Sequence, residues 1–220
     1  NLRTRAVRND DHYIVNGQKV WTSRALYSDL MLLLARTTPR EEVTKPTDGL
    51  SVFLIDLREL KDNGVEIRPI DTMINHNTTE VFFSDAKIPA ASLVGEEGKG
   101  FRYILDGMNA ERTLIASESI GDARFFLERA SSYACERKIF GGPIGRNQGI
   151  QFPLARAHAE TEAAELMARK AAALFDDGQP CGPEANMAKL LCAEAAWHAG
   201  EACMQTFGGF AFAREYDIER

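Results

Sequence analysis

The sequence predicts an α+β protein in which a small antiparallel β barrel or sandwich precedes an antiparallel helical bundle. Residues 1–92 hold short β-branched and aromatic runs between polar turns, whereas residues 93–220 hold three long helical patterns with short connections. A loop over residues 95–100, with a glycine at each end, separates the strand-like pattern from the helical pattern. We therefore expect a partial β domain over 1–92 and a partial helical domain over 93–220.

The β half is expected to contain a hairpin near its start. Asn16 and Gly17 form a strong two-residue hairpin signal and separate the strand-like segments 13–15 and 18–21. Strands of this length with regular turns favour an antiparallel barrel or sandwich. The further expected strands are 30–36, 50–56, 65–70 and 80–83.

The helical half is expected to contain three long helices. They should run over residues 101–135, 153–177 and 183–207. Glycines follow the second and third patterns, as is typical of helix ends. Because the connections are short, successive helices should pack antiparallel, as in a bundle.

Composition excludes several classes of function. The 220 residues are 45% apolar, carry a net charge of −6 and show no block of basic residues, so nucleic acid is not an expected partner. The longest apolar run, 30–35, is too short to span a membrane. The four cysteines form no paired motif, so we expect no metal site and buried, reduced thiols. We expect a cytoplasmic protein, or one of the mitochondrial matrix in a eukaryote, and a fragment of a longer chain because it starts at Asn1.

The connection over residues 133–152 is the most informative segment. Arg137 and Lys138 supply cations, glycines allow close approach of the backbone, and Asn147 and Gln148 add neutral donors. Such a set suits a flat, anionic ligand with many hydrogen-bonding groups. The alternative is an ordinary connection between two helices.

Glu111 is the candidate for acid–base chemistry. It completes a helical series with residues 101, 104, 108 and 115, which are apolar, so a carboxylate is expected on an apolar stripe. Desolvation there would raise its pKa and suit a general base. Two alternatives remain, a structural ion pair with a facing helix and a rotated stripe that leaves Glu111 solvated.

Two further segments could meet a ligand. Trp21, followed by Thr22 and Ser23, could present an indole face and hydroxyl groups to an aromatic ligand, or Trp21 could be a core residue. Gln205 lies shortly before the glycine pair Gly208 and Gly209, which could contact a dinucleotide or simply cap a helix.

With these segments in order, the chain resembles the acyl-CoA dehydrogenase family. The motifs that carry the resemblance lie in register at residues 20–25, 111–117, 136–152 and 205–220. The resemblance implies an N-terminal helical domain, a middle β domain and a C-terminal four-helix bundle. This chain is similar to most of the middle domain and much of the bundle.

The resemblance also implies FAD as the cofactor. The arginine and glutamine patches match family positions that meet the FAD of a neighbouring subunit, which implies a homodimer or homotetramer. The residues implied in cofactor binding are Trp21, Thr22, Ser23, Arg137, Lys138, Ile139, Phe140, Gln148, Gln205, Gly208 and Gly209.

The family chemistry is α,β-desaturation of an acyl-CoA thioester by removal of an α-proton and transfer of a β-hydride to flavin. The resemblance implies Glu111 as the base, unless the base lies beyond Arg220, and Asn109 and Arg112 as substrate-binding residues. An electron-transferring flavoprotein is a candidate partner. An acyl-CoA oxidase or flavin-dependent monooxygenase on the same fold, and a non-catalytic binding or scaffold protein, remain alternatives.

Overall fold

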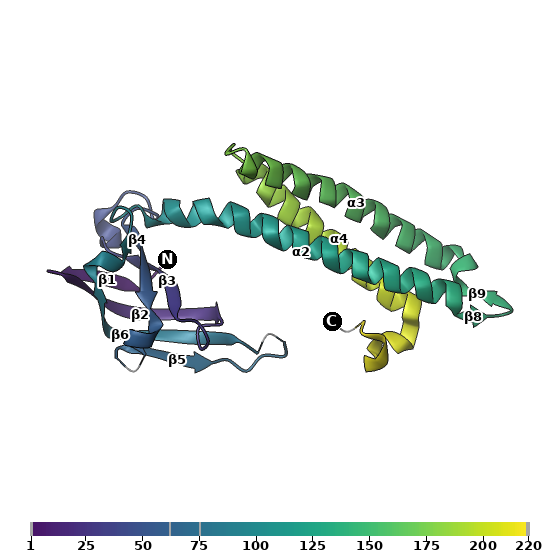
Figure 1. Ribbon diagram of the computed structural model, residues 1–220, viewed down its shortest axis with the longest axis horizontal. Helices are drawn as coiled ribbons and strands as arrows, with labels where there is room; N and C mark the ends of the chain where they lie inside the picture. Colours follow the sequence, from purple (N-terminus) through teal and green to yellow (C-terminus); the bar gives the residue numbers. More distant parts are fainter. Residues whose placement is uncertain (1, 62, 75, 219–220) are drawn as a thin grey trace. The chain divides into compact units, whose positions relative to one another are not determined.

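The computed structural model of the chain describes residues 2–61, 63–74 and 76–218. These residues form two compact units that divide between residues 106 and 107, which Figure 1 shows as a β unit and a helical unit. The division falls within the long helix α2 (Gly100–Glu136). The expected α+β class, a β domain followed by a helical bundle, is confirmed.

The β unit is built on one sheet, in which seven strands are found among the described residues. Their spatial order is β5-β6-β2-β1-β3-β4-β7; β1 and β3 pair in parallel, and the other pairings are antiparallel. The strands are β1 (Arg5–Asn9), β2 (His12–Ser23), β3 (Leu30–Arg36), β4 (Leu50–Asp56), β5 (Val65–Pro69), β6 (Thr78–Pro89) and β7 (Leu93–Val94). Short helical turns are η1 (Arg40–Glu42), α1 (Leu57–Leu60) and η2 (Ala90–Ser92).

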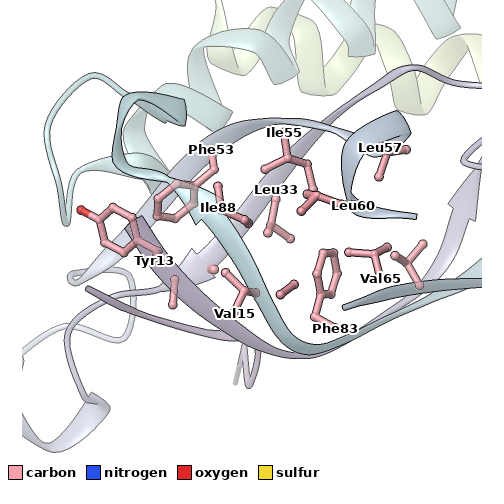
Figure 2. Close-up of a cluster of buried hydrophobic side chains, with 14 of the residues drawn as sticks. Tyr13, Val15, Leu33, Phe53, Ile55, Leu57, Leu60, Val65, Phe83 and Ile88 are labelled. Carbon is pink, nitrogen blue, oxygen red and sulfur yellow. The ribbon is translucent and has the colours of Figure 1, made fainter. Parts of the chain in front are cut away.

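The core of the β unit lies inside this sheet, which is strongly curved. Val65 of β5 and Phe53 of β4 belong to strands near opposite ends of the strand order, yet both lie in one buried cluster. The rings of Tyr13 and Phe53 meet edge to face with centroids 4.8 Å apart. Figure 2 shows these side chains converging from several strands and from α1. The alternation of inward and outward residues along the strands produces this interior.

The hairpin expected at Asn16 and Gly17 is wrong. Strand β2 continues through both residues, and the turn lies between β1 and β2, where Asp10 takes a φ of 53°. Asn16 instead holds a bulge of β6: its Nδ2 donates to the carboxylate of Asp85, and the amide of Asp85 donates to Asn16 Oδ1, each at 2.9 Å. Gly17 is required because a Cβ there would lie 2.6 Å from Thr4 Cα. Asn16 therefore stabilises a bulge of β6, and Gly17 allows a close contact between strands.

The helical unit contains three long helices in the part of the chain that the structure describes. They are α2, α3 (Gln148–Asp176) and α4 (Gly182–Phe207), and a small ribbon of β8 (Lys138–Ile139) and β9 (Gly142–Pro143) joins the first two. Helix α3 begins at Gln148, earlier than expected, and Pro153 lies inside it. The proline removes one main-chain hydrogen bond of the helix but does not end it. Shorter turns are η3 (Ile144–Arg146), η4 (Gly208–Phe212) and η5 (Arg214–Tyr216).

Small side chains fill the interfaces of the bundle. The buried positions of α3 and α4 are mainly alanines, together with Cys192 and Cys203. Burial raises the pKa of the Cys203 thiol to about 11, so this thiol stays protonated. Cys181 is also buried, but Cys135 is exposed, which corrects the expectation that all four thiols are buried.

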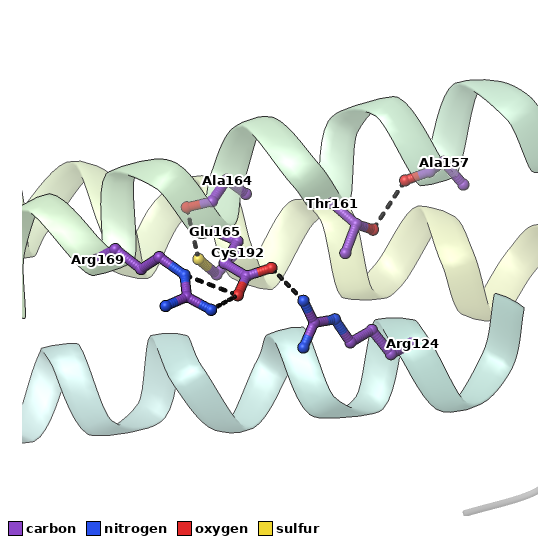
Figure 3. A network of polar contacts seen from close by, with 7 residues as sticks. All are labelled: Arg124, Ala157, Thr161, Ala164, Glu165, Arg169 and Cys192. Atoms are coloured by element: carbon purple, nitrogen blue, oxygen red, sulfur yellow. Dashed lines mark hydrogen bonds and ion pairs between the residues drawn. The ribbon is translucent and has the colours of Figure 1, made fainter. Parts of the chain in front are cut away.

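A polar network links α2 to α3 at the edge of this core. Figure 3 shows Glu165 between Arg124 of α2 and Arg169, one turn along α3, with Arg169 Nη2 donating at 2.6 Å. The two guanidinium groups, first that of Arg169, lower the pKa of the Glu165 carboxyl. Nearby, Cys192 Sγ donates to the carbonyl of Ala164 at 3.4 Å. These contacts are structural and lie apart from the candidate ligand residues named above.

Candidate functional site

Trp21 is displayed on the surface of the β unit by an irregular piece of strand. Between the pairs Lys19–Val81 and Thr22–Thr79, β2 carries one residue more than β6, so the ladder contains a bulge. Trp21 lies in it with a φ of 61°, a conformation that bulky residues rarely adopt. Its side chain is 68% exposed. Trp21 is therefore not part of the core of the β unit, and a strained backbone holds its indole outward.

The two hydroxyl residues after Trp21 return to regular pairing. Thr22 pairs with Thr79, whose Oγ1 donates to the Thr22 carbonyl at 2.7 Å, and Ser23 pairs with Thr78. Ser23 is exposed. This pairing fixes the backbone directly after the bulge and leaves the Ser23 hydroxyl free to meet a ligand.

Lys19 supports the same strand just before the bulge. Its Nζ donates at 2.6 Å to the carbonyl of Leu34 in β3, although β2 and β3 are not paired with each other. Burial lowers the pKa of the Lys19 ammonium to about 8. Leu34 pairs with Val52 of β4, and among the described residues β1 meets β3 only at Arg36, so the lysine reaches a carbonyl of β3 across a gap in the strand pairing.

The basic ribbon of the helical unit is also exposed. Lys138 and Ile139 form β8, and Phe140 follows in the turn with a φ of 52° and a fully exposed ring, at 105%. Arg137 is exposed too, and its guanidinium lies 5.8 Å from the centroid of the Phe210 ring. A ligand outside this unit can therefore reach the cation and the aromatic tip.

The contact between Arg137 and Phe210 brings two distant segments together. Gly208 and Gly209 directly precede Phe210, and a Cβ built on either glycine meets no described atom within 4 Å. Gly208 requires its positive φ of 62° to end α4. Gly209 has neither a positive φ nor a close neighbour, so its missing side chain leaves open backbone surface. Gln148, the first residue of α3, is exposed as well.

Gln205 and Gly208 border an apolar groove of about 1070 Å³ between α2 and α4. Three aromatic side chains line it, those of Phe126 from α2, Trp197 from α4 and Phe212 from η4. The exposed polar side chain of Gln205 thus lies at the border of a surface that is mainly apolar and also includes Ser119, Asp122 and Glu201.

The apolar stripe expected around Glu111 is not buried within the helical unit. The buried residues of this part of α2 are Ala116, Ile120 and Ala123, so the face that contacts the bundle is rotated away from Glu111. Glu111 is exposed, and among the described residues it has no ion pair or hydrogen-bonding partner for its side chain. Within the described residues, the exposed carboxylate matches the alternative of a solvated Glu111 rather than that of an ion pair with a facing helix. The carboxylate remains free to act on a ligand.

Arg112 and Asn109 lie on a different side of α2 from Glu111. Arg112 Nη1 donates to Asn109 Oδ1 at 3.2 Å, and Arg112 also borders a groove of about 440 Å³. Asn186 and Lys189 of α4 line that groove too. The structure therefore combines two cations and an amide at one place beside α2.

Sequence reasoning missed Asn186, Lys189 and Phe210. The first two lie three residues apart on one face of α4, a spacing that could have marked them. Phe210 directly follows the glycine pair and had no comparable signal. Within the described residues, no group of three or more His, Cys, Asp or Glu side chains is placed to hold a metal ion. None of the helices described is long and apolar enough to cross a bilayer.

Comparison with known proteins matches both halves of the chain to domains of one protein family. Residues 1–86 match the model of the acyl-CoA dehydrogenase middle domain, and residues 98–220 match that of the acyl-CoA dehydrogenase C-terminal domain. An acyl-CoA dehydrogenase of Bacillus subtilis is 35% identical over 222 residues, which are 100% of this chain and 57% of that protein. Cyclohex-1-ene-1-carbonyl-CoA dehydrogenase of Syntrophus aciditrophicus is 35% identical over 228 residues, with 100% and 52% covered.

Solved structures agree with the sequence matches. The acyl-CoA dehydrogenase of Geobacillus kaustophilus superposes with a TM-score of 0.92 at 31% identity, over 100% of this chain and 57% of that one. The chain thus spans little more than half the length of the proteins it matches. Both halves match in order, and the chain belongs to the acyl-CoA dehydrogenase family.

Proposed function

We propose that the protein is an FAD-dependent oxidoreductase that introduces a double bond between Cα and Cβ of an acyl-CoA thioester. The observation that carries the proposal is that the residues at the family's flavin and base positions are exposed and not used in the chain's own core. Trp21, Arg137, Phe140 and Glu111 all present their side chains outward. Family membership supplies the class of reaction, and this exposure leaves the residues free to carry it out.

The residues present fit FAD chemically. The indole of Trp21 offers an apolar face to a flat ring, and the Ser23 hydroxyl beside it can donate a hydrogen bond. Arg137 offers a forked donor that suits a diphosphate, and Gly209 leaves backbone surface open for close approach. When bound, FAD supplies the acceptor for the hydride that leaves Cβ. A related solved structure, PigA with FAD and proline, is 29% identical with a TM-score of 0.91, which supports this cofactor.

Glu111 is the proposed base. Its carboxylate takes the α-proton, and exclusion of water by bound substrate would strengthen it as a base. Arg112 and Asn109 are proposed to position the substrate, because their contact holds the guanidinium at the 440 Å³ groove. Lys138, Ile139, Gln148, Gln205 and Gly208 complete the proposed cofactor contacts.

We further propose that the arginine patch serves the FAD of a neighbouring subunit in a homodimer or homotetramer. The exposure of Arg137 and its distance of 5.8 Å from the Phe210 ring support this, since the guanidinium is not neutralised by an acid within the described residues. An electron-transferring flavoprotein is the proposed electron acceptor. A relative of Acetobacterium woodii, named as subunit CarC of a caffeyl-CoA reductase-Etf complex, is 33% identical and supports such a partner.

The test is anaerobic mixing of the FAD-loaded protein with acyl-CoA thioesters, followed by the loss of flavin absorbance. Glu111→Gln should retain flavin and slow bleaching by about 10²-fold or more. Glu118→Gln, an exposed carboxylate on the same helix, is the matched control and should bleach at the wild-type rate. Bleaching of the Glu111 variant at the wild-type rate would show that the base lies elsewhere.

An oxidase is the second candidate. The prolyl acyl carrier protein oxidase AnaB superposes with a TM-score of 0.92 at 27% identity, so this fold also serves oxygen chemistry. Peroxide formed in step with substrate consumption in air would favour the oxidase. Electron transfer to an electron-transferring flavoprotein without peroxide would favour the dehydrogenase.

A further inference from the structure

Gly107 is an exposed glycine inside the long helix α2 for which the described residues show no packing reason. Glycine inside a helix is destabilising relative to alanine, so it normally has a conformational or packing reason. Gly107 does not have a positive φ, and a Cβ built on it meets no described atom within 4 Å. Neither reason applies, so the missing side chain leaves empty space on the outside of the helix.

That space lies directly beside the proposed base. Gly107 and Glu111 are separated by four residues, and residues with this spacing share one face of a helix. Helical side chains lean toward the N-terminus, so the Glu111 side chain extends over the surface at position 107. A side chain at 107 would therefore occupy the place next to the carboxylate.

On the other side of Glu111 the same helix presents apolar side chains. Leu114 is 66% exposed and Ile115 is 39% exposed, although both are large and hydrophobic. The carboxylate thus lies between an empty position and an apolar wall. A substrate whose α-hydrogen reaches the carboxylate must place the other groups on Cα and Cβ against this stretch of helix, because the base needs hydrogen-bonding distance to that proton.

We propose that Gly107 is a specificity-determining residue that makes room for a branched or cyclic acyl group at the reacting carbons of the thioester. The inference rests on the proposed function, because it takes Glu111 as the base. A straight-chain acyl group carries only hydrogens on Cα and Cβ besides the atoms of the chain itself, so it does not need the space. A ring or branch needs the volume that a side chain at position 107 would fill.

The experiment adds bulk at position 107 in the full-length, FAD-loaded protein. Gly107→Ala and Gly107→Val are compared with Gly121→Ala, because Gly121 lies in the same helix and a Cβ there also meets no described atom within 4 Å. Anaerobic bleaching is measured with butyryl-CoA, isobutyryl-CoA and cyclohexanecarbonyl-CoA. Thermal melting of each variant provides a measurement that does not depend on substrate.

Both alanine variants should melt at or above the wild-type temperature, because alanine favours the helix. Gly107→Ala should lower kcat/KM for the branched and cyclic substrates by about tenfold or more and leave the straight-chain value within about threefold, and valine should widen the gap. Gly121→Ala should leave the ratio between substrates unchanged.

Two results would overturn the inference. If the wild type bleaches with acyl-CoA but the ratio between substrates is the same in Gly107→Ala, position 107 does not select substrates, and the proposed function stands without it. If the wild type bleaches with no acyl-CoA, the proposed function fails and the inference fails with it.

Discussion

Lys19 gives the most quantitative prediction for the β unit. Its ammonium is half-buried, its Nζ donates to the Leu34 carbonyl, and burial lowers its pKa from 10.5 to about 8. Between these two values the unfolded chain holds the proton and the folded protein does not, so the free energy of unfolding must rise with pH through this window. From about pH 7 to about pH 9.5 the shift corresponds to about 2 kcal/mol, or about 1–2 kcal/mol after allowance for partial solvent exposure.

The perturbation is Lys19→Met, which keeps the aliphatic length and removes the titrating group. Urea unfolding of the wild type and the variant is measured at several pH values across that window. The difference in unfolding free energy, wild type minus variant, should increase by about 1–2 kcal/mol as the pH rises. Lys87→Met, an exposed lysine of β6, is the control and should give a flat difference. A flat difference for Lys19→Met as well would refute the argument that burial of the ammonium destabilises the folded state.

Three further predictions concern single positions. Gly17→Ala should destabilise the protein by about 2 kcal/mol or more in thermal melts, because its Cβ would lie 2.6 Å from the opposing main chain. Gly149→Ala should be neutral or stabilising, because a Cβ there is unobstructed and the residue lies in α3. Trp21→Asn should stabilise the protein by about 1 kcal/mol in thermal melts, since asparagine tolerates the left-handed backbone, while FAD binding measured by fluorescence weakens; loss of stability would contradict this account of strain. Thiol labelling of the native protein near pH 8 should modify Cys135 rapidly and Cys203 only after unfolding, as peptide mass mapping can check.

Regular elements were predictable because each has a local signal. The strands at 30–36 and 50–56 were expected at the bounds observed, and α4 differs by one residue from the expected helix. Apolar periodicity and flanking turn residues carry this information within a few residues of sequence. The bulged strand β2 was not predictable in the same way, because the role of Asn16 depends on Asp85, which lies far along the chain.

In the candidate site, too, the residues with a local sequence signal were predictable and those whose environment depends on tertiary packing were not. Residue types alone identified Arg137, the glycine pair and Trp21 as unusual, and the structure leaves them exposed. The environment of Glu111 was mispredicted because several apolar residues of α2 lie outside the buried face, and a stripe of apolar residues was taken for the core. The buried face of α2, formed by Ala116, Ile120 and Ala123, could not be recognised from the sequence. Alanine packs closely, but it contributes only weakly to a hydrophobic pattern.

Those alanines have a mechanical consequence for the helical unit. A methyl group has no rotamers, so a seam made of Ala164, Ala168, Ala188 and Ala195 cannot adapt by turning its side chains. The axial distance between α3 and α4 is therefore fixed by contacts close to the two backbones. Because the helices run in opposite directions, Gln148 at the beginning of one and Gln205 near the end of the other are held at a constant span. A larger residue anywhere along this seam would push α3 and α4 apart. The distance between the two glutamines would then increase, although the substituted residue contacts neither.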